Sequence, residues 1–419
     1  MVESFVVQGG KRIEGRIRVD SAKNAVLPLM AACVLTPEPV ILTDVPDITD
    51  ATHMAEILAM LGCSVQREGR GMRICCGDIH NWEMPDRLSK QIRSSIFLLG
   101  PILSRFRKAT VTFPGGCEIG QRPIDLHLAG LRSLGVEIRE EGGLIHCDGA
   151  HMHAGEVHFD YPSVGATENV MMAAVCLRGT TVIHNAAREP EIRDVQEFIN
   201  ALGGRIHGAG GHTIVIEGVE DLRGGTWEPM PDRIVAGTLL CAAAITAGEI
   251  ELERAPVEDM IAITAKLREM GCRIHEEPGR IALQAPERLS AFSQLQTQPH
   301  PGFPTDMQVQ MLALLSVAEG TGVIVENVFE NRFTHAGDLG RMGAHILCSG
   351  RTAVVRGVKE LYGARVTARD LRGGAALVLA GLRAQGVTQV DRAELIDRGY
   401  DHLEAQLCRL GADVTRMRT

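Results

Sequence analysis

The chain has 419 residues, of which 45% are hydrophobic, a composition typical of a soluble globular protein with two or three domains. The formal net charge is -9 and no run of basic residues occurs, which argues against a general surface for nucleic acids or anionic membranes. The sequence has no uninterrupted apolar stretch of about 18 residues and does not begin like a signal peptide, so we expect a cytoplasmic protein with no membrane segment.

One short phrase with a central glycine recurs six times at intervals of roughly 70 residues. Its copies are Leu61-Gly62-Cys63, Leu134-Gly135-Val136, Leu202-Gly203-Gly204, Met270-Gly271-Cys272, Met342-Gly343-Ala344 and Leu410-Gly411-Ala412. The residues before each copy predict an apolar helix, a β-branched strand, a polar loop and an amphipathic helix that ends at the glycine. A strand and a turn then close each unit.

The first helix of every unit is rich in alanine and apolar nearly all round, so it should be buried. In chain order these helices are expected over Ala25 to Leu35, Ser95 to Ser104, Val170 to Leu177, Val235 to Ala247, Val309 to Ala318 and Ala375 to Ala384. The second helix of each unit, such as Asp194 to Leu202 or Glu258 to Met270, has one polar face and should lie nearer solvent.

Six such units predict an α/β fold of two pseudo-symmetric groups of three, with internal helices and outer sheets. The Pro- and Gly-rich residues 220–231 are expected to be the crossing point. Residues 22–229 would then form the first domain. Residues 230–419 would form the second together with residues 1–21, because the N-terminal strands precede the first helix and are free to pack with the last copies.

The loop Phe113 to His127 is a candidate site, because it joins two glycines, a thiol, an arginine and a carboxylate between a predicted strand and a predicted helix. Cys117 has glycine and polar neighbours, although an unreactive thiol is the simpler interpretation. Other cysteines, namely Cys33, Cys176, Cys241 and Cys408, lie in apolar patterns and read as small buried residues. Residues 146–158 hold four histidines and Cys147, but their spacing matches no standard metal site.

Several charged residues occur in single copies of the repeat, at one of two helix N-termini, where free N–H groups favour anions. Lys23-Asn24, Arg93, Ser163 to Thr167, Asp306 and Arg372 begin apolar helices, and Cys117 with Arg122, Arg332 and Arg398 precede amphipathic helices. Taken singly, each arginine could be a surface residue and Asp306 an N-cap. Together, five arginines and a lysine indicate a substrate with phosphate and carboxylate groups, with one carboxylate as base and one thiol as acid or nucleophile.

Nine phrases in one order resemble the UDP-N-acetylglucosamine 1-carboxyvinyltransferase family, the UDP-GlcNAc enolpyruvyl transferases of the EPSP synthase superfamily. They are Ser21 to Ala25, Arg93 to Ser95, Pro114 to Cys117, Gly120 to His127, Ser163 to Asn169, Phe303 to Gln308, Val328 to Phe333, Asp370 to Arg372 and Ile396 to Tyr400. The resemblance implies two inside-out α/β barrels of three units each, with the active site in the cleft between them.

The reaction that the resemblance implies is transfer of the enolpyruvyl group of phosphoenolpyruvate to the 3-hydroxyl of UDP-N-acetylglucosamine, through a tetrahedral ketal, with release of phosphate. It needs no cofactor and no metal, and it is the first committed step of peptidoglycan synthesis. The resemblance therefore implies a part in cell wall biogenesis, cell shape, cell division and the cell cycle, and inhibition by fosfomycin.

The resemblance also implies a role for each matching residue. Lys23, Arg122 and Arg398 would hold the phosphate of phosphoenolpyruvate, Arg332 and Arg372 its carboxylate, and Arg93 would line the site. Asp306 would take the proton of the sugar hydroxyl, and Cys117 would be the general acid and the residue that fosfomycin alkylates. The contacts to UDP-N-acetylglucosamine would be Asn24, Arg122, Pro123, Ile124, Asp125, Leu126, His127, Ser163, Val164, Gly165, Asp306 and Val328.

Two residues depart from the family or bear on its chemistry. Tyr161 stands where many members have a lysine, which affects one contact on the uridine side. Glu118 places a negative charge beside Cys117, which opposes thiolate formation and suits an acid better than a nucleophile. We expect the Cys117 loop to close over the bound sugar nucleotide and to exclude water.

Three alternative functions stay open. The shikimate-pathway synthase shares the six-unit fold but has no counterpart of the Gly-Gly-Cys loop. A non-catalytic paralogue that binds the UDP-sugar is disfavoured by the retention of all six cations, Asp306 and Cys117. A nucleic-acid-processing protein on a similar repeat is disfavoured by the net charge of -9.

Overall fold

The structure is a computed structural model that describes residues 3–84, 93–112 and 124–418. These residues form two compact units, each with its own apolar core. The C-terminal unit contains residues 3–20 and 231–418, and the N-terminal unit contains residues 21–84, 93–112 and 124–230. Within these described ranges, no helix is long and apolar enough to cross a membrane.

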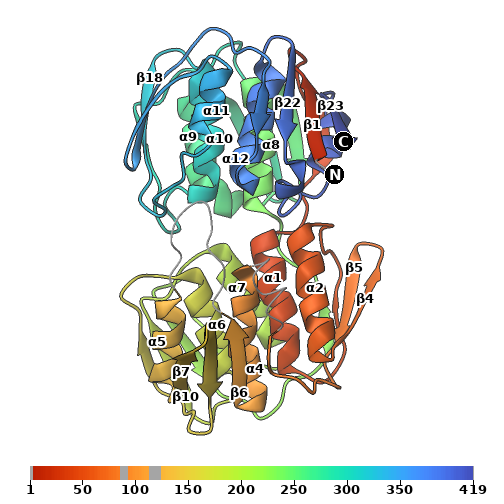
Figure 1. The fold of residues 1–419 in the computed structure, drawn as a ribbon, viewed down its shortest axis with the longest axis vertical. Helices are drawn as coiled ribbons and strands as arrows, with labels where there is room; N and C mark the ends of the chain where they lie inside the picture. The colour runs from red at the N-terminus through yellow and green to blue at the C-terminus, as the bar shows by residue number, and fades with distance from the viewer. Residues whose placement is uncertain (1–2, 85–92, 113–123, 419) are drawn as a thin grey trace. The chain divides into compact units, whose positions relative to one another are not determined.

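Three buried helices pack against one another in the middle of the C-terminal unit, and its strands lie outside them (Figure 1). The buried helices are α8 (Arg233–Ile245), α10 (Thr305–Val317) and α12 (Leu371–Arg383). Shorter helical segments lie further out: η3 (Val257–Met260), α9 (Ile261–Glu269), α11 (Ala336–Arg341), η4 (Ala393–Leu395) and α13 (Leu403–Arg409). The alternation of an apolar and an amphipathic helix in the sequence is therefore confirmed in this unit.

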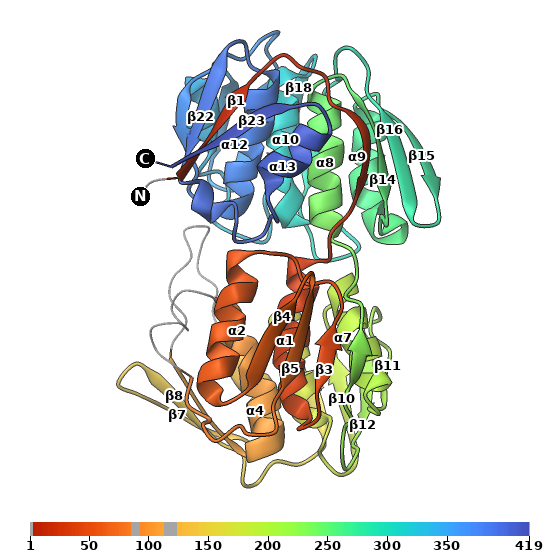
Figure 2. The ribbon, with the colours of Figure 1, turned by 90° about the vertical axis from the view of Figure 1, so that its right-hand side faces the viewer.

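Three four-stranded sheets surround these helices (Figure 2). In sheet order they are β2 (Glu14–Arg18), β14 (Glu249–Glu253), β16 (Arg280–Gln284) and β15 (Arg273–Glu277); β17 (Gln294–Gln296), β18 (Thr321–Val325), β20 (Thr352–Arg356) and β19 (His345–Ser349); and β21 (Arg365–Thr367), β22 (Val387–Asp391), β1 (Glu3–Gln8) and β23 (Asp413–Arg418).

The N-terminal unit repeats this plan. Its apolar helices are α1 (Lys23–Ala32), α4 (Leu99–Phe106) and α6 (Val164–Ala174). The 3₁₀ turn η1 (Cys33–Leu35) continues α1, and the 3₁₀ segment η2 (Arg93–Leu98) precedes α4. Its outer helices are α2 (Thr49–Leu61), α5 (Asp125–Ser133) and α7 (Pro190–Ala201). The sheets, in order, are β13 (Gly225–Trp227), β3 (Val40–Leu42), β5 (Gly71–Cys75) and β4 (Ser64–Glu68); β6 (Lys108–Thr112), β8 (Leu144–Asp148) and β7 (Glu137–Glu141); and β9 (Glu156–His158), β10 (Thr180–His184), β12 (Thr213–Glu217) and β11 (Ile206–His207).

All six sheets share one pairing pattern, which confirms the sixfold repeat. The strand that follows a buried helix pairs in parallel with an edge strand and antiparallel with the next inner strand, as β18 does with β17 and β20. In the β6 sheet, the part of this parallel edge that falls within the described residues is a bridge from Glu83 to Thr110. The glycines of the repeated phrase have φ values from 83° to 108°, a left-handed conformation that side chains resist, so they end the amphipathic helices as expected.

Two edge strands are exchanged where the chain passes from one unit to the other. β2 comes before α1 in the chain but pairs with β14 of the C-terminal unit, while β13 comes before α8 but pairs with β3 of the N-terminal unit. β1 fills the position between β22 and β23.

The cysteines follow the expectation only in part. Cys33 and Cys241 are buried, as their apolar surroundings predict, and Cys176 is half-buried. Cys408 is exposed, so its assignment to the buried set is wrong. It lies on the polar side of α13, whose buried residues are Leu403, Gln406 and Leu407. The cysteines that the structure describes are free thiols.

Candidate functional site

The clearest cluster of predicted site residues lies in the C-terminal unit, around the carboxylate of Asp306. Arg332 Nη2 donates to Asp306 Oδ1 over 2.7 Å. Arg372 Nη2 and Nε donate to Asp306 Oδ2 over 3.2 and 3.3 Å. Arg332 follows Asp306 by 26 positions in the sequence and Arg372 follows it by 66, and the fold brings all three together. Both oxygens of the Asp306 carboxylate therefore accept hydrogen bonds.

The two guanidinium groups are buried, but the carboxylate reaches solvent. The side chains of Arg332 and Arg372 are 2% exposed, whereas that of Asp306 is 25% exposed. Burial alone would lower the pKa of Arg372, but the neighbouring Tyr400, Asp306 and Asp232 raise it above its ordinary value. Arg332 Nε and Arg372 Nη1 have no hydrogen-bond partner among the described residues. Because buried charged donors are costly to leave unpaired, this cluster is suited to receive an anion.

The interpretation of Asp306 as a simple N-cap is wrong. The N-cap of α10 is Pro304, and no side chain caps this helix. Asp306 is instead the second residue of α10, where a carboxylate still interacts favourably with the helix dipole. Asp370 is the residue that caps its helix, because its Oδ1 accepts from the backbone N–H groups of Arg372 and Gly373.

Glu326, which none of the predicted site motifs includes as a site residue, holds the loop that carries Val328 and Arg332. It is fully buried, and its Oε1 accepts from the backbone N–H groups of Val328 and Phe329 over 2.8 and 3.0 Å. Its Oε2 accepts from the hydroxyl of Thr305 over 2.9 Å. Glu326 therefore fastens the Arg332 loop to the first turn of α10, beside Asp306. The only signal in the sequence is a charged residue directly after a β-branched strand.

Replacing Glu326 by Gln should lower the free energy of unfolding by about 1–3 kcal/mol, since the amide NH₂ would face either N–H donors or a hydroxyl that now lacks a strong acceptor. Urea unfolding at pH 7 measures the effect. Glu330→Gln, at an exposed ion pair with Arg351, is the matched control and should change stability by less than about 1 kcal/mol. Equal losses in the two variants would contradict the assignment of Glu326 as a buried fastening point.

His335 lies behind Arg332 and is 1% exposed, and neither of its ring nitrogens has a hydrogen-bond partner in the described part of the chain. Burial lowers the pKa of His335 to about 4, and Arg332 adds to this, although Asp370 and Asp338 act in the opposite direction. The imidazole is therefore neutral at pH 7 and adds no third positive charge to the two guanidinium groups.

This histidine should make the protein sensitive to acid. Its folded-state pKa lies below the unfolded value of about 6.5, so between about pH 6.5 and pH 4 the unfolded chain binds a proton that the folded protein excludes. The free energy of unfolding should fall by up to about 3 kcal/mol across this range as the pH is lowered. His335→Leu should remove this part of the pH dependence, as measured by urea unfolding at pH 7, 5.5 and 4. The control His345→Leu, at an exposed position, should retain the wild-type slope.

Arg398 lies half-buried in the turn between η4 and α13. Arg416 anchors this turn, because its guanidinium contacts Asp397 over 2.6 and 2.7 Å, Glu3 over 2.6 Å and Glu404 over 2.9 Å. Arg416 of β23 thus holds the neighbouring Asp397, and Glu3 of the adjacent strand β1 binds the same guanidinium. Arg416 is a second residue that the sequence analysis missed, since nothing in its local sequence distinguishes it from an ordinary surface arginine.

In the N-terminal unit, Lys23 is the first residue of α1 and forms a buried ion pair with Asp50 of α2, with Nζ 2.8 Å from Oδ2. Both residues are at least nine-tenths buried. The ammonium group is therefore held in one position at a helix N-terminus. Asn24, the next residue, is half-buried.

Among the predicted sugar-nucleotide residues of this unit, the structure places Gly165 against His127, which is buried on α5. Asn169 of α6 places its amide nitrogen 2.7 Å from His127 Nδ1 and also binds the backbone of Ile96 and Gly100. A Cβ atom on Gly165 would lie 2.9 Å from the imidazole, so only glycine allows this contact. Ser163 caps α6 by accepting from Ala166 N.

The other predicted residues differ in how far the structure describes them. Ile124 is buried just before α5, Asp125 is exposed as its first residue, and Leu126 and Val164 are half-buried. Arg93 begins η2, and only its backbone is described. Cys117, Glu118, Arg122 and Pro123 lie outside the described residues, and so does the loop that we expect to close over the substrate. Tyr161 is 46% exposed.

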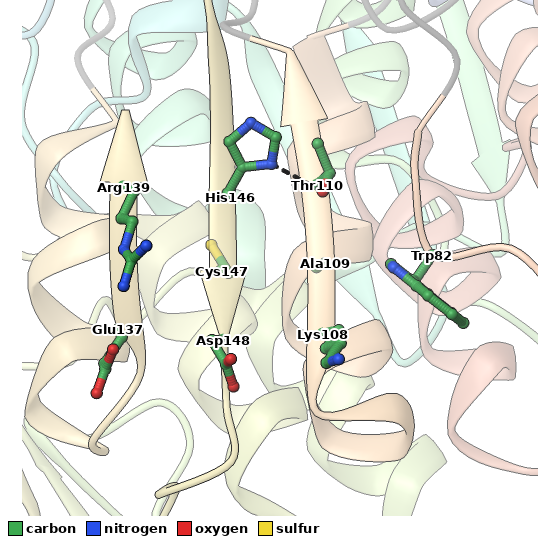
Figure 3. Close-up of a pocket in the computed structure, with 9 residues that line it drawn as sticks. All are labelled: Trp82, Lys108, Ala109, Thr110, Glu137, Arg139, His146, Cys147 and Asp148. Carbon is green, nitrogen blue, oxygen red and sulfur yellow. Dashed lines mark hydrogen bonds between the residues drawn. The ribbon is translucent and has the colours of Figure 1, made fainter. Parts of the chain in front are cut away.

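A separate shallow pocket of about 260 Å³ lies on the β6–β8–β7 sheet (Figure 3). It is lined by Trp82, Lys108, Ala109, Thr110, Glu137, Arg139, His146, Cys147 and Asp148. Its cations are balanced by two carboxylates, so it lacks the excess positive charge of an anion site. His146 Nδ1 is bonded to the Thr110 hydroxyl over 3.3 Å. In the described ranges no three histidine, cysteine or acidic residues lie close enough to hold a metal ion.

Comparison with known proteins shows close relatives along nearly the whole chain. The sequence model of the EPSP synthase family, described as 3-phosphoshikimate 1-carboxyvinyltransferase, matches residues 7–407. UDP-N-acetylglucosamine 1-carboxyvinyltransferase 2 of Caldanaerobacter subterraneus is 49% identical, over 99% of this chain and 99% of its own. UDP-N-acetylglucosamine 1-carboxyvinyltransferase of Myxococcus xanthus is 46% identical, again over 99% of both chains.

Solved structures show the same fold at lower identity. The enolpyruvyl transferase NikO from Streptomyces tendae is 24% identical and superposes with a TM-score of 0.89, over 100% of this chain and 99% of its own. EPSP synthase from Acinetobacter baumannii is 17% identical, with a TM-score of 0.75 and full coverage of both chains. The expected enolpyruvyl transferase fold is thereby confirmed.

Proposed function

Because the chain belongs to the EPSP synthase family, and within it to the UDP-N-acetylglucosamine 1-carboxyvinyltransferases, we propose that it transfers the enolpyruvyl group of phosphoenolpyruvate to the 3-hydroxyl of UDP-N-acetylglucosamine and releases phosphate. It is then a transferase that acts at the first committed step of peptidoglycan synthesis. A cytoplasmic location, a part in cell division and cell shape, and inhibition by fosfomycin belong to the same proposal.

The observation that carries the proposal is the Asp306 cluster. Two buried guanidinium groups share one carboxylate that is 25% exposed, and each has a further N–H donor with no partner among the described residues. Such a pair suits the carboxylate of phosphoenolpyruvate, which offers two oxygens to planar donors. The substrate carboxylate would compete with Asp306 for the same guanidinium groups.

This competition gives Asp306 its role as a base. In the free protein both of its oxygens accept hydrogen bonds from arginines. When the substrate carboxylate occupies Arg332 and Arg372, an Asp306 oxygen becomes available to accept the proton of the sugar hydroxyl. In this proposal, phosphoenolpyruvate prepares the base that the acceptor needs.

The remaining residues complete the balance of the reaction. Cys117 gives a proton to the methylene carbon of phosphoenolpyruvate, which makes C2 electrophilic, and the sugar oxygen adds to C2 as Asp306 takes its proton. The tetrahedral ketal then loses phosphate from C2 and a proton from the methyl carbon, which forms the enolpyruvyl ether; this proton returns to the Cys117 thiolate, and the proton held by Asp306 leaves with the phosphate. Lys23, Arg122 and Arg398 hold the phosphate throughout, with Arg93 lining the site. Asn24, Arg122 to His127, Ser163 to Gly165 and Val328 contact the sugar nucleotide.

The test is a phosphate-release assay with phosphoenolpyruvate and either UDP-N-acetylglucosamine or shikimate 3-phosphate as acceptor. We expect release with the sugar nucleotide alone. Cys117→Ser and fosfomycin treatment should each abolish it, while Cys117→Asp should no longer respond to fosfomycin because it has no thiol to alkylate. Absence of phosphate release with both acceptors would overturn the proposed activity, and release with shikimate 3-phosphate alone would reassign it.

A further inference from the structure

A buried polar network lies directly beneath the Asp306 cluster and joins all three central helices of the C-terminal unit. Tyr400, which is 1% exposed, places its hydroxyl 3.0 Å from Thr238 Oγ1 of α8 and 3.2 Å from the side-chain amide of Gln310 on α10. Gln310 and Thr238 are fully buried. Burying polar side chains in an apolar core costs free energy unless they are hydrogen-bonded to one another. A buried network of this kind therefore points to a role beyond packing.

The amide of Gln310 connects this network to the backbone of Asp306. With its nitrogen turned towards the start of α10, Gln310 donates to the carbonyl oxygens of Asp306 and Met307 over 3.0 and 3.2 Å. Its oxygen then accepts from the hydroxyls of Tyr400 and Thr238. This orientation is assigned because it pairs each donor with an acceptor, whereas the opposite one does not.

Tyr400 also connects the network to Arg372. The guanidinium carbon of Arg372 lies 5.1 Å from the centre of the Tyr400 ring, within the range of a cation–π interaction. Arg372 in turn binds Asp306. The contacts therefore form a closed ring, from Asp306 through Arg372, Tyr400 and Gln310 back to Asp306. Tyr400 is, in addition, two residues from Arg398 in the same turn.

We propose that Tyr400 and Gln310 are positioning residues, which keep Arg372 and the first turn of α10 in place when the carboxylate of phosphoenolpyruvate takes over the arginines from Asp306. This inference rests on the proposed function. Neither Tyr400 nor Gln310 contacts the substrate in the arrangement that we propose. Because they act through Arg372 and Asp306, replacing either residue should change kcat and the KM for phosphoenolpyruvate. The KM for the sugar nucleotide should stay the same.

The test compares Tyr400→Phe with Tyr362→Phe, a substitution at a tyrosine that is 56% exposed in the same unit. Tyr400→Phe keeps the ring over Arg372 and removes only the hydroxyl. We expect its kcat to fall about 10-fold, within the range that supporting residues of active sites show. Its KM for phosphoenolpyruvate should rise, its KM for UDP-N-acetylglucosamine should not change, and Tyr362→Phe should match the wild type in all three values.

A double-mutant cycle separates positioning from general destabilisation. If Tyr400 acts through Arg372, adding Tyr400→Phe to Arg372→Lys should reduce kcat/KM by much less than 10-fold. A full, multiplicative loss in the double variant, or wild-type kinetics in Tyr400→Phe, would overturn the inference. Gln310→Met, which keeps the side-chain length without the amide, should reproduce the Tyr400→Phe pattern.

Calorimetric titration with phosphoenolpyruvate alone keeps this inference distinct from the proposed activity. If the wild type binds phosphoenolpyruvate but releases no phosphate with UDP-N-acetylglucosamine, the activity is wrong, and a roughly 10-fold weaker binding in Tyr400→Phe would still support the positioning role. Equal binding by the wild type and Tyr400→Phe would count against the positioning role, whatever the acceptor proves to be.

Discussion

Asp306→Asn should abolish turnover and, at the same time, strengthen the binding of phosphoenolpyruvate. An amide cannot take the proton of the acceptor hydroxyl, and loss of a general base lowers kcat by about 10²–10⁴-fold. Asp306 is also the group that occupies Arg332 and Arg372 in the free protein. The amide offers one acceptor oxygen in place of two and has no charge, so the guanidinium groups should be more available to a substrate carboxylate.

Phosphate release gives kcat, and calorimetry gives the dissociation constant for phosphoenolpyruvate. We expect the dissociation constant of Asp306→Asn to fall about 10- to 100-fold, because a charge-assisted hydrogen bond contributes about 1.5–3 kcal/mol and at least one of those to Asp306 is lost. Asp338→Asn is a less suitable control, because that residue lies near His335. Glu330→Gln removes an exposed charge from the same unit and should leave both values unchanged. If phosphoenolpyruvate binding weakened in parallel with kcat, Asp306 would not be its competitor.

When Arg332 or Arg372 is removed, we expect phosphoenolpyruvate to bind more weakly, which is the opposite of the result expected for Asp306→Asn. Arg332 and Arg372 are each 2% exposed, so they cannot exchange Asp306 for water when one partner is missing. Each therefore holds the carboxylate in position and, in the proposed reaction, would also bind the substrate carboxylate. This double dependence explains why the same three residues serve both steps of the proposed reaction.

The repeated elements could be predicted from the sequence because they follow local physical rules. A helix that is apolar all round has to be buried, and a glycine after an amphipathic helix permits the left-handed turn that ends it. The six positive φ values at these glycines agree with that expectation. Resemblance to a family suggested Asp306, Arg332 and Arg372, and the structure brings these three together.

The supporting residues could not be predicted in the same way. Glu326, Gln310 and Tyr400 owe their roles to partners on other helices and strands, and local periodicity carries no information about such pairs. Gln310 did leave one signal in the sequence, since it is one of the polar residues within the mostly apolar part of α10.

Arg416→Gln should produce the largest loss of stability among the substitutions considered for this unit. The Arg416 side chain is 16% exposed and neutralises Asp397, Glu3 and Glu404, which are 14–23% exposed. Without the guanidinium, three carboxylates would face one another in a partly desolvated site. Breaking such a pair costs about 3–5 kcal/mol, and the residual exposure favours the lower end of that range. The turn that carries Arg398 should loosen as well, which would raise the KM for phosphoenolpyruvate.

Arg418→Gln is the matched control, because Arg418 is 68% exposed and pairs with the same Glu3. Arg418→Gln should lower the free energy of unfolding by less than about 1 kcal/mol.

The pH dependence of the stability difference between wild type and Arg416→Gln gives a second test. Hydrogen bonding to Arg416 lowers the pKa of Glu3 below its ordinary 4.5 in spite of partial burial, so this contribution is present at pH 7 and is lost as the pH falls through the folded-state value. The difference between wild type and Arg416→Gln in urea unfolding should therefore be largest near pH 7 and narrow towards pH 4. A constant difference over this range would show that Arg416 stabilises the turn by packing on Phe5, 4.7 Å away, and not by its charge.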